Sequence, residues 1–253
     1  MRREELTEPV REFVRVRPHL YDRIRRAKRL IPGASPESFG VLDEFSRAHD
    51  RSVNFVQIGA NDGLRNDPLR PLIVRDDWQG VLVEPLPTVI PLLERNYAYL
   101  RRPELVLLNA AAVAAPAPNL EFWTFSEEFL GMQSPSDRLD YLRKASFERD
   151  HLIGFVPSDR DPDQVLVSIE VDTVPLTQIV QEHLPRAPLH LLAIDAEGFE
   201  STLIPGIDFG QVDVEAVFFE SEHLGADRAR VLEHLSGHGF ALRQVGLDTL
   251  ASR

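Results

Sequence analysis

The chain of 253 residues contains no cysteine. This absence excludes disulfides, zinc–thiolate sites, iron–sulfur clusters and every cysteine nucleophile. It also excludes the thiolate with which base-methylating enzymes attack pyrimidine C6. Any metal site in this protein must therefore be built from carboxylate and imidazole ligands.

Long apolar runs are missing too. No segment approaches the roughly 18 uninterrupted apolar residues that a membrane-spanning helix needs. The N-terminal sequence MRREELTEPVREF mixes acids with arginines and lacks the apolar stretch of a signal peptide. The sequence therefore predicts a cytoplasmic protein that has no membrane partner.

Positive charge is in the minority, because 28 Lys+Arg face 40 Asp+Glu, for a formal net charge of −12. Such a surface repels a phosphate backbone, so the composition argues against a nucleic-acid partner. Residues 1–30 carry ten basic and five acidic side chains and sum to +5, which leaves −17 on residues 31–253. With 43% hydrophobic residues, the chain can bury the full core of a globular domain.

Two helices are expected ahead of the main domain. Apolar residues at helical spacing among arginines predict an amphipathic helix over residues 20–30. We interpret it as packing on the domain with its basic face in water, rather than as a membrane or partner helix. A serine followed by a proline predicts a second helix over residues 35–49. We therefore expect an N-terminal helical extension at 1–50 and the main domain at 51–253.

From Val53 onward, short apolar runs alternate with helical patterns. This alternation is typical of an α/β fold in which helices cover both faces of a mostly parallel sheet. Helices are expected from residue 67 and over residues 88–100. The apolar runs that predict strands lie at residues 53–58, 80–83, 105–108, 189–194 and 214–219.

The alternation breaks after Asn109. Residues 119–125 (NLEFWTF) predict an additional strand, and alternating apolar residues over 166–172 predict another. Between them, residues 126–165 form a polar insertion in which we expect one helix, at 136–145. An insertion of this length in an α/β sheet is more often a lid or a substrate wall than a linker.

Ligands of an open α/β sheet bind beyond the carboxyl ends of the strands. The first predicted strand runs into a turn with the sequence QIGANDG, whose glycines let a ligand approach the backbone. The second strand ends at Glu84, 21 residues after Gly63. A carboxylate at that spacing accepts hydrogen bonds from both hydroxyls of an adenosine ribose. The sequence therefore predicts an adenosine-containing ligand, held by Gly59, Ala60, Asn61, Asp62, Gly63 and Glu84.

Two kinds of ligand fit this pattern, a dinucleotide and S-adenosylmethionine. A dinucleotide site needs a GxGxxG turn that opens a helix facing the pyrophosphate. Here the turn is GANDG, the next helix is expected only at Asp67, and Asp62 would place a negative charge beside the pyrophosphate. An acidic loop suits the sulfonium and ammonium groups of S-adenosylmethionine instead. A short-chain reductase needs a tyrosine and a lysine four residues apart, which neither Lys28 nor Lys144 provides.

The glycine turn and Glu84, together with further motifs along the chain, are similar to those of the FkbM-type S-adenosylmethionine-dependent methyltransferases. The resemblance implies a Rossmann-like class I methyltransferase fold with a seven-stranded, mostly parallel sheet. It also implies S-adenosylmethionine as cofactor and methyl transfer to a hydroxyl oxygen of a sugar, polyketide-type product or other small metabolite. The motifs that carry it are FVQIGANDG (55–63), GVLVEPLP (80–87), LNAAAV (108–113), VDTVPL (171–176), LLAIDAEGFE (191–200) and FFESEHL (218–224).

One position departs from the family pattern, because Gln57 stands where many members carry an aspartate. The amide oxygen of Gln57 can still accept a hydrogen bond from the ammonium group of the cofactor, although it contributes no charge. Gln57 is therefore a candidate cofactor-binding residue whose role is less direct than that of an acid.

A further candidate site follows the third strand. Asn109, Ala110 and Ala111 would leave a flat slot for adenine beside an amide able to bond the edge of the base. Ordinary packing of alanines at a strand end explains the same residues equally well. Asn109 and Ala110 are thus candidate cofactor-binding residues with an open structural alternative.

Carboxylates and an imidazole follow the last two predicted strands, which should be neighbours in the sheet. Methylation of a neutral alcohol requires a group that removes the hydroxyl proton. A carboxylate crowded by like charges has a raised pKa and becomes a better base, and a histidine titrates near neutral pH. The candidate catalytic residues are Asp195, Glu197, Glu222 and His223, and Asp195 is also a candidate cofactor ligand.

Other roles fit the same residues. Acids such as Glu197 and Glu200 are stabilised at the start of a helix whatever the function, and His223 could serve only as a helix cap. The carboxylates also offer hard oxygen ligands for Mg²⁺, but no dense ligand spacing supports a metal site, so we do not favour one.

The sequence thus favours an S-adenosylmethionine-dependent O-methyltransferase with a small-molecule acceptor that the insertion covers. Two alternatives remain: a non-catalytic protein that binds S-adenosylmethionine or a partner, and a nucleotide-dependent oxidoreductase. A nucleic-acid methyltransferase is disfavoured, because the motif (N/D)PP(Y/F) is absent. The acceptor and the oligomeric state, a dimer included, are not determined by the sequence.

Overall fold

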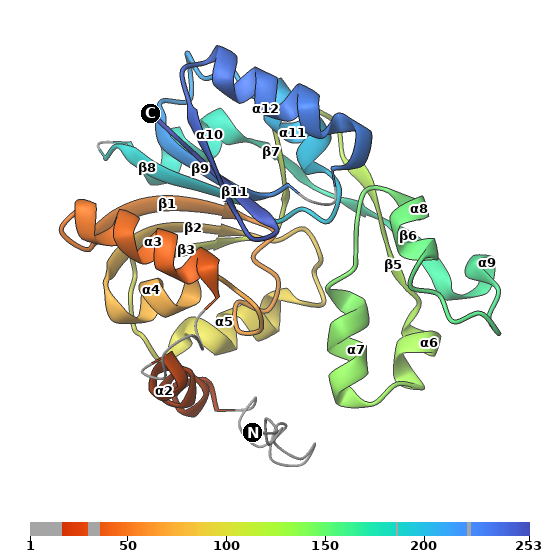
Figure 1. Cartoon of the computed structure of the whole chain (residues 1–253). Helices are drawn as coiled ribbons and strands as arrows, with labels where there is room; N and C mark the ends of the chain where they lie inside the picture. The colour runs from red at the N-terminus through yellow and green to blue at the C-terminus, as the bar shows by residue number, and fades with distance from the viewer. Residues whose placement is uncertain (1–16, 30–35, 186, 222–223) are drawn as a thin grey trace.

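The computed structural model describes residues 17–29, 36–185, 187–221 and 224–253. Figure 1 shows a central twisted sheet between two groups of helices, with a smaller arm beside it. Within the described residues, no helix is long and apolar enough to cross a membrane.

Seven strands form the central sheet in the order β10-β11-β9-β8-β1-β2-β3. All neighbours pair in parallel except β11, which is antiparallel to both β9 and β10. The predicted α/β fold with a seven-stranded, mostly parallel sheet is confirmed. The strands are β1 (Ser52–Ile58), β2 (Asp77–Val83), β3 (Leu105–Leu108), β8 (Leu189–Ile194), β9 (Val214–Glu220), β10 (Ala241–Val245) and β11 (Asp248–Ser252).

The five predicted apolar runs are all strands of this sheet, whereas the hairpin of β10 and β11 matches none of them. Four of the five residues of β10 are exposed, because β10 lies at the edge of the sheet. An edge strand in water does not need the apolar residues by which buried strands are identified. The hairpin therefore has no strong apolar signal in the sequence.

The two faces of the sheet carry separate apolar clusters. On one face, Val56 and Val217 pack with residues of three helices that follow β7, β8 and β9. On the other face, Phe55 and Phe218 pack with residues of three helices from the first half of the chain. The first group is α10 (Leu176–His183), α11 (Glu200–Gly206) and α12 (Arg228–Gly237), and the second is α3 (Glu37–Ala48), α4 (Arg70–Arg75) and α5 (Ile90–Ala98).

The helix expected from residue 67 begins three residues later, at Arg70. Asp67 lies in the turn before it, and its carboxylate accepts hydrogen bonds from the backbone N–H groups of Leu69, at 2.8 Å, and Arg70, at 3.1 Å. Asp67 therefore stabilises the first turn of α4 although it lies outside the helix.

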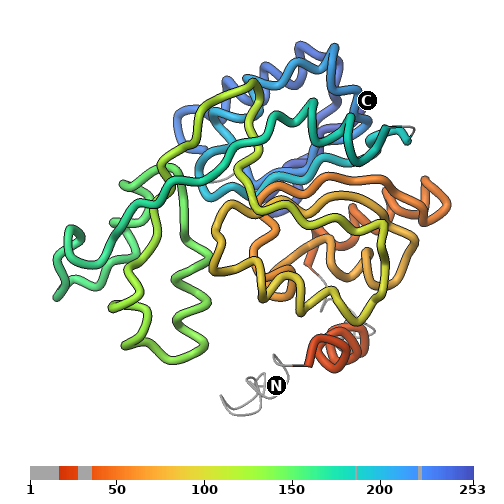
Figure 2. Tube along the Cα trace, turned by 180° about the vertical axis from the view of Figure 1, so that it is seen from behind, coloured from red at the N-terminus to blue at the C-terminus, as the bar shows by residue number. Residues whose placement is uncertain are grey.

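The insertion forms the arm that projects from the body in Figure 2. The strands predicted at 119–125 and 166–172 are β5 (Leu120–Phe125) and β6 (Leu166–Val171), which the structure pairs antiparallel along the arm. The helix predicted at 136–145 is present as α7, but the segment also contains three short helices that the sequence did not predict, and the four surround an apolar cluster of their own. These helices are α6 (Glu127–Gly131), α7 (Pro135–Leu142), α8 (Arg149–Ile153) and α9 (Pro162–Val165).

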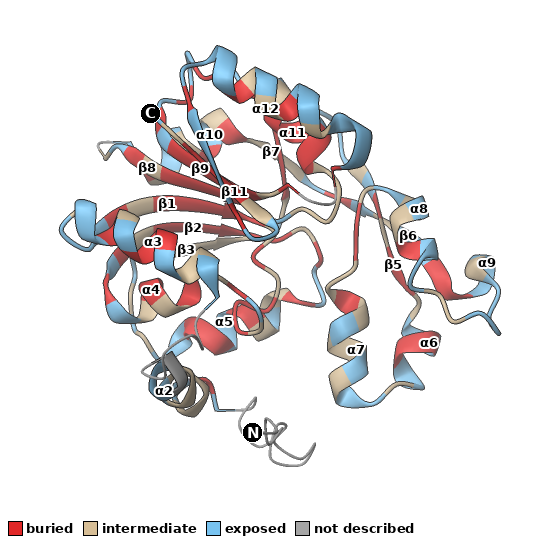
Figure 3. Cartoon of the chain, viewed as in Figure 1, coloured by how far each residue is buried: buried red, intermediate tan, exposed pale blue. Residues whose placement is uncertain are grey.

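A small parallel pair joins the arm to the sheet. Strand β4 (Ala111–Val113) pairs with β7 (Thr173–Pro175), which leads directly into α10. The small residues of β4 are buried at this junction. Figure 3 colours buried residues red and shows that much of the central sheet is buried. The pair thus fixes where the arm leaves the body, beside the carboxyl ends of β2 and β3.

The helix predicted at 20–30 is α2 (Pro18–Arg29), and the helix predicted at 35–49 is α3. Residues 30–35, which connect the two helices, lie outside the described residues. Arg70, only 2% exposed, holds α2 against the body through two hydrogen bonds of 2.9 Å to the carboxylate of Asp22. The same guanidinium also donates to the carbonyl oxygen of Gly63 at 2.6 Å, so it joins α2 to the glycine turn.

Candidate active site

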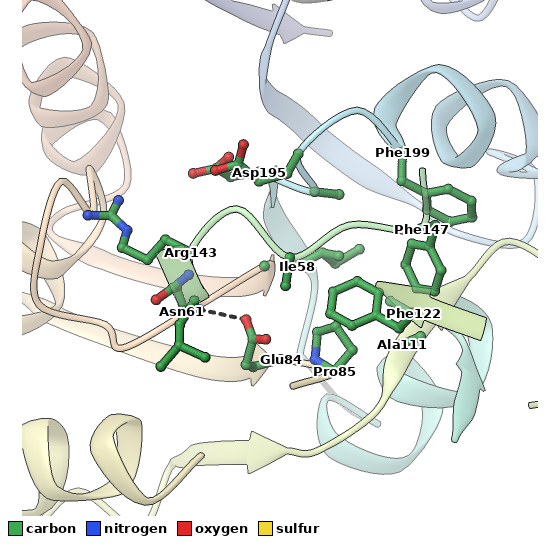
Figure 4. Close-up of a pocket in the computed structure, with 16 residues that line it drawn as sticks. Ile58, Asn61, Glu84, Pro85, Ala111, Phe122, Arg143, Phe147, Asp195 and Phe199 are labelled. Carbon is green, nitrogen blue, oxygen red and sulfur yellow. Dashed lines mark hydrogen bonds between the residues drawn. The ribbon is translucent and has the colours of Figure 1, made fainter. Parts of the chain in front are cut away.

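Two adjoining cavities lie at the carboxyl ends of β1, β2 and β8. The first cavity, drawn in Figure 4, contains Glu84 and Pro85 and is bordered by β4 and the arm. The second cavity lies over the ends of β8 and β9 and reaches the β10–β11 turn and the start of α3. Arg143, Asp195 and Glu197 line both, so the two cavities meet at these three residues.

The glycine turn after β1 brings two chain segments into direct contact. Gly59 has a φ of +78°, and a Cβ atom built on it would lie 1.8 Å from the carbonyl oxygen of Asp195. Gly63 has a φ of +60°, and its Cβ would lie 2.4 Å from the ring of Tyr97. Both positions therefore require glycine. At Gly59 the reason is the close approach of the loops after β1 and β8, not the approach of a ligand.

Glu84 occupies the end of β2 as the sequence predicts. One of its oxygens accepts a hydrogen bond from the backbone N–H of Asn61 and the other from that of Leu86, each at 2.9 Å. Burial raises the pKa of Glu84 to about 7, and the neighbouring Asp62 adds to this rise. Each oxygen keeps acceptor capacity beyond its one backbone bond, so the carboxylate can still receive two hydroxyl donors.

Asp62 and Asn61 shape the turn from within. The carboxylate of Asp62 accepts hydrogen bonds from the N–H groups of Leu64, at 3.0 Å, and Arg65, at 3.1 Å, and its side chain is buried. Asn61 adopts a φ of +48° and points its own N–H toward Glu84. Among the sequence candidates, Asp62 therefore supports the turn, while Asn61 lines the first cavity.

Gln57 is buried at the floor of the second cavity, with 4% of its surface exposed. Its Nε2 donates to Oδ1 of Asp67 at 3.3 Å, which fixes the orientation of the amide because a carboxylate only accepts. The opposite atom, Oε1, has no hydrogen-bond partner among the described residues. A buried acceptor without a partner is costly, so the structure leaves a place here for an N–H or O–H donor.

Asn109 lies at the end of β3, where its Nδ2 donates to the carbonyl oxygens of Glu84, at 2.9 Å, and Pro85, at 3.0 Å. The amide therefore ties β3 to the loop after β2. Neither Asn109 nor Ala110 lines the first cavity, whereas the next residue, Ala111, does. The small-residue slot predicted here begins one residue later in the structure.

Aromatic side chains of the arm and of the loop after β8 complete the first cavity. In Figure 4, the rings of Phe122, Phe147 and Phe199 form one wall, with Arg143 on the opposite side. The ring centroids lie 4.8 Å apart for Phe122 and Phe147 and 4.5 Å apart for Phe147 and Phe199. Phe199 belongs to the motif LLAIDAEGFE and Phe122 to the predicted strand at 119–125, whereas no sequence pattern marks Phe147.

Asp195 follows β8 and lies where the two cavities meet. Its side chain is exposed to solvent in the cleft. Partial desolvation by the surrounding protein, together with the charges of Glu197, Glu200 and Glu220, raises the pKa of Asp195 to about 8. A carboxylate in such surroundings has the properties of a general base near neutral pH.

Glu197 is occupied by partners from the arm. Its carboxylate lies 3.2 Å from Nζ of Lys144 and 3.2 Å from Nε2 of His151. Burial favours the neutral acid, but these hydrogen bonds and charges outweigh it and lower the pKa of Glu197. Glu197 is therefore held as an anion that anchors the arm, which makes it a weak base.

Glu200 holds the loop between β8 and α11. Its two carboxylate oxygens accept hydrogen bonds from the backbone N–H groups of Ala196 and Gly198. Burial raises the pKa of this side chain. The remaining candidate bases, Glu222 and His223, lie outside the described residues.

Four charged residues of the cleft were not among the sequence candidates, one of which is Glu37 at the start of α3. Arg143, the residue after α7, lines both cavities, and no hydrogen bond or ion pair joins its guanidinium to the described part of the chain. Glu220 and Asp248 line the second cavity from β9 and β11. Glu220 belongs to the motif FFESEHL quoted above, but no local pattern marks Arg143 or Asp248.

The strand-end carboxylates do not form a metal cluster within the described part of the chain. Among the described residues, the group with three converging ligand atoms is His49, His190 and Glu215, at the amino ends of β8 and β9. Nδ1 of His190 accepts a hydrogen bond from the N–H of Asn54 at 2.9 Å. The neutral ring then carries its proton on Nε2, the nitrogen that faces Glu215, which leaves no lone pair there for a metal.

A family model described as the methyltransferase FkbM domain matches residues 57–242 of the chain. No curated protein matches the chain. Similar solved structures include a methyltransferase FkbM from Methylobacillus flagellatus KT, which is 13% identical with a TM-score of 0.46. That similarity covers 80% of this chain and 44% of the other, so the chain spans less than half the length of that protein.

Two further solved structures share less of the sequence. Precorrin-6y C5,15-methyltransferase from Geobacter metallireducens GS-15 is 9% identical with a TM-score of 0.37, over 82% of this chain and 84% of the other. Fibrillarin from Aeropyrum pernix, solved with natively bound S-adenosyl-L-methionine, is 10% identical with a TM-score of 0.37. The similarity covers 79% of this chain and 67% of the fibrillarin chain.

Proposed function

Since the chain belongs to the FkbM methyltransferase family, whose model matches residues 57–242, we propose that it transfers a methyl group from S-adenosylmethionine to a hydroxyl oxygen of a small acceptor. The observation that carries this proposal is the pairing of Glu84 with Asp195 across one cleft. Glu84 is a buried carboxylate that can receive two hydroxyls, and Asp195 is a carboxylate with a raised pKa. The cleft thus offers both a site for a ribose and a base.

The residues of the first cavity fit the adenosine part of the cofactor. Glu84 receives the two ribose hydroxyls, and the N–H of Asn61 keeps its carboxylate in place. Pro85, Ala111 and Phe122 offer flat apolar surfaces for the base. Asn109 positions this wall through its bonds to Glu84 and Pro85, and Ala110 precedes it in the chain.

The second cavity fits the amino-acid part of the cofactor. Oε1 of Gln57 lacks a hydrogen-bond partner in the described part of the chain, and an ammonium group supplies the missing donor. Arg143 offers a cation for the carboxylate. The backbone of Gly59 and Ala60 is held against the end of β2, because both N–H groups donate to the carbonyl oxygen of Val83 at 3.0 Å. Bound S-adenosylmethionine supplies a methyl group activated by a positive sulfur.

Asp195 is the base in this proposal. One carboxylate oxygen of Asp195 takes the proton of the acceptor hydroxyl. The acceptor oxygen thereby becomes more nucleophilic as it attacks the methyl group of the cofactor. Glu200 keeps the loop of Asp195 in place by binding the N–H of Ala196 and of Gly198. Glu222 and His223 remain proposed alternative bases, and Glu197 positions the arm. The arm itself, at 126–165, forms the wall that covers a sugar, polyketide-type or similar acceptor.

Calorimetric titration with S-adenosylhomocysteine tests the cofactor half of the proposal. We expect the wild-type protein to bind, and Glu84→Ala to weaken binding by about 100-fold, since two hydrogen bonds to a charged acceptor are lost. Glu104→Ala removes an exposed carboxylate at the amino end of β3 and serves as control. Absence of binding by the wild type, or equal binding by Glu84→Ala, contradicts the proposal.

A transfer assay with labelled S-adenosylmethionine tests the catalytic half. Label in a methyl ether of a hydroxylated acceptor supports O-methylation. Binding without transfer to any fraction of a cell extract would instead favour a non-catalytic binding protein. Failure to bind S-adenosylhomocysteine, together with protection against heat by NAD(P)H, would favour an oxidoreductase.

A further inference from the structure

Helix α2 lies ahead of the family domain, which begins at residue 57. It nevertheless packs on that domain, beside α4 and α5, as Figures 1 and 2 show from opposite sides. Its attachment to the body uses Asp22, the one acid of the helix, whose other charged residues are all basic. The role of α2 therefore depends on what Asp22 holds.

Asp22 is the counter-ion of a buried arginine. Its two carboxylate oxygens accept hydrogen bonds of 2.9 Å each from Nε and Nη2 of Arg70, and the hydroxyl of Tyr99 donates to the same carboxylate. Within the described residues, Asp22 is the only acid in an ion pair with Arg70, whose side chain is 2% exposed. A buried guanidinium that loses its counter-ion is strongly destabilised. The position of Arg70 thus depends on the attachment of α2.

The same guanidinium holds the end of the glycine turn. Nη1 of Arg70 donates to the carbonyl oxygen of Gly63 at 2.6 Å, and Nη2 donates to that of Asn96 at 2.9 Å. Nδ2 of Asn96 in turn donates to the carbonyl oxygen of Asp62 at 2.8 Å. The last two carbonyl groups of the turn are therefore fixed by Arg70 and by a residue that Arg70 binds.

A second connection leads from Arg70 to the floor of the second cavity. Its guanidinium lies 4.7 Å from the centroid of the ring of Tyr97, the ring that packs against Gly63. The hydroxyl of Tyr97 donates to Oδ2 of Asp67 at 3.1 Å, and Oδ1 of Asp67 accepts from Nε2 of Gln57 at 3.3 Å. All four side chains are buried, so a shift of the guanidinium must displace its neighbours.

Stability alone is a weak reason for the pair of Asp22 and Arg70, because apolar side chains of similar size often stabilise a buried site as well or better. Under the function proposed above, the glycine turn and Gln57 bind the methyl donor. On that basis we infer that α2 is part of the cofactor site, with Asp22 as a positioning residue that acts through Arg70 on the turn. Attached α2 and bound cofactor then stabilise each other.

Calorimetric titration of the full chain with S-adenosylhomocysteine gives the first test. We expect Asp22→Asn to raise the dissociation constant about tenfold. The control is Asp43→Asn, because Asp43 of α3 pairs with Arg75 at the other end of α4, at 2.5 Å. This variant also loosens a helix from α4, but it should keep the affinity of the wild type. Wild-type affinity in Asp22→Asn, or equal losses in both variants, would overturn the inference.

A double variant separates positioning from stability. Asp22→Leu/Arg70→Met replaces both charges with apolar side chains and should resist urea better than Asp22→Asn does. Its affinity for S-adenosylhomocysteine should stay about tenfold below that of the wild type, because methionine donates no hydrogen bond to Gly63. Recovery of the affinity together with the stability would mean that the pair only holds the fold, and would overturn the inference.

Hydrogen exchange tests the reciprocal effect in the unmodified protein. No described residue of α2 lines either cavity, so a bound ligand cannot cover this helix directly. Saturating S-adenosylhomocysteine should nevertheless slow amide exchange within residues 20–27 about tenfold, and should not slow it in Asp22→Asn. Equal exchange of the wild type with and without the ligand would contradict the role of α2.

The two proposals fail in different ways. If the wild type does not bind S-adenosylhomocysteine, the proposed function is wrong, and the role of α2 is wrong with it. If the wild type binds and Asp22→Asn binds equally well, only the role of α2 is wrong.

Discussion

Nζ of Lys144 lies 3.2 Å from Oε1 and 3.3 Å from Oε2 of Glu197, and this ion pair joins the arm to the loop after β8. The hydroxyl of Ser146 adds a hydrogen bond of 2.8 Å to the carbonyl oxygen of Glu197. Glu197 itself has a φ of +47°, an uncommon conformation for a residue with a side chain. Glu197 is therefore one of the residues that hold the arm over the cleft, together with the ring contact of Phe147 with Phe199 and the ion pair of Arg65 with Asp140.

Loss of the lysine charge should loosen the arm. We expect Lys144→Met to weaken binding of S-adenosylhomocysteine by about fivefold, the effect of losing a partly exposed ion pair of about 1 kcal/mol. Cleavage by trypsin within residues 126–165 should become faster. Arg138→Met removes the exposed partner of Glu127 in the same arm and should change neither measurement. Equal effects of both variants would show that the Lys144–Glu197 pair has no special role.

Binding of S-adenosylhomocysteine should depend on the ionisation of Glu84. Burial raises the pKa of this carboxyl to about 7, and the protonated form loses an acceptor that a ribose hydroxyl needs. The dissociation constant should therefore rise about tenfold for each pH unit below about 7 and stay constant above it. In Glu84→Gln, binding should be weak and independent of pH over this range. Calorimetry between pH 5 and 8 checks both expectations, and a flat wild-type profile would contradict them.

The rate of methyl transfer should follow the ionisation of Asp195. A base with a pKa of about 8 in the ligand-free protein is protonated at lower pH, so kcat/KM should rise about tenfold per pH unit up to about 8 and then level off. Asp195→Asn should lower kcat by about 100-fold or more while binding of S-adenosylhomocysteine changes little. If the loss appears in cofactor binding instead, Asp195 acts as a cofactor ligand. If Asp195→Asn keeps its rate and His223→Ala does not, His223 is the base.

Gly59 should be the least replaceable residue of the turn. Its Cβ would lie 1.8 Å from the carbonyl oxygen of Asp195, and its φ is +78°, so Gly59→Ala is expected to cost about 3 kcal/mol or more. Gly40 lies in α3, where a Cβ atom would meet nothing within 4 Å outside its own helix, so Gly40→Ala should stabilise by about 0.5–1 kcal/mol. Urea unfolding of the two variants measures both. A tolerated alanine at 59 would mean that the loops after β1 and β8 can separate.

Much of the sheet could be predicted, because strands such as β1 and β8 are buried on both faces and so carry continuous apolar runs. The place of Glu84 was equally readable, since it depends only on its distance from the glycine turn. The edge hairpin could not be read in this way, because β10 is mostly exposed. The four helices of the arm are short, and helices of one or two turns leave little periodicity in the sequence.

The chemistry of the acids was harder to predict than their position. Asp62, Asp195 and Glu197 all follow strands, and the sequence presents them as similar carboxylates. In the structure, Asp62 binds the N–H groups of its own turn, and Glu197 binds Lys144, 53 residues earlier in the chain. Asp195 alone of the three has no hydrogen bond to its carboxylate in the described part of the chain. Its raised pKa follows from desolvation, from the charges of Glu197 and Glu200 in the same loop, and from the charge of Glu220, which folding brings next to it from β9.

By itself, the sequence determined the order of strands and helices, the absence of thiol chemistry and the strand ends at which Glu84 and Asp195 stand. These properties follow from local periodicity, residue type and spacing, which do not depend on distant contacts. Only the tertiary structure decided which of the strand-end acids binds other protein groups, that Arg143 enters the cleft and that Asp248 opposes Glu220. A pKa and a cavity depend on all neighbours in space, and folding brings those neighbours from segments far apart in the chain.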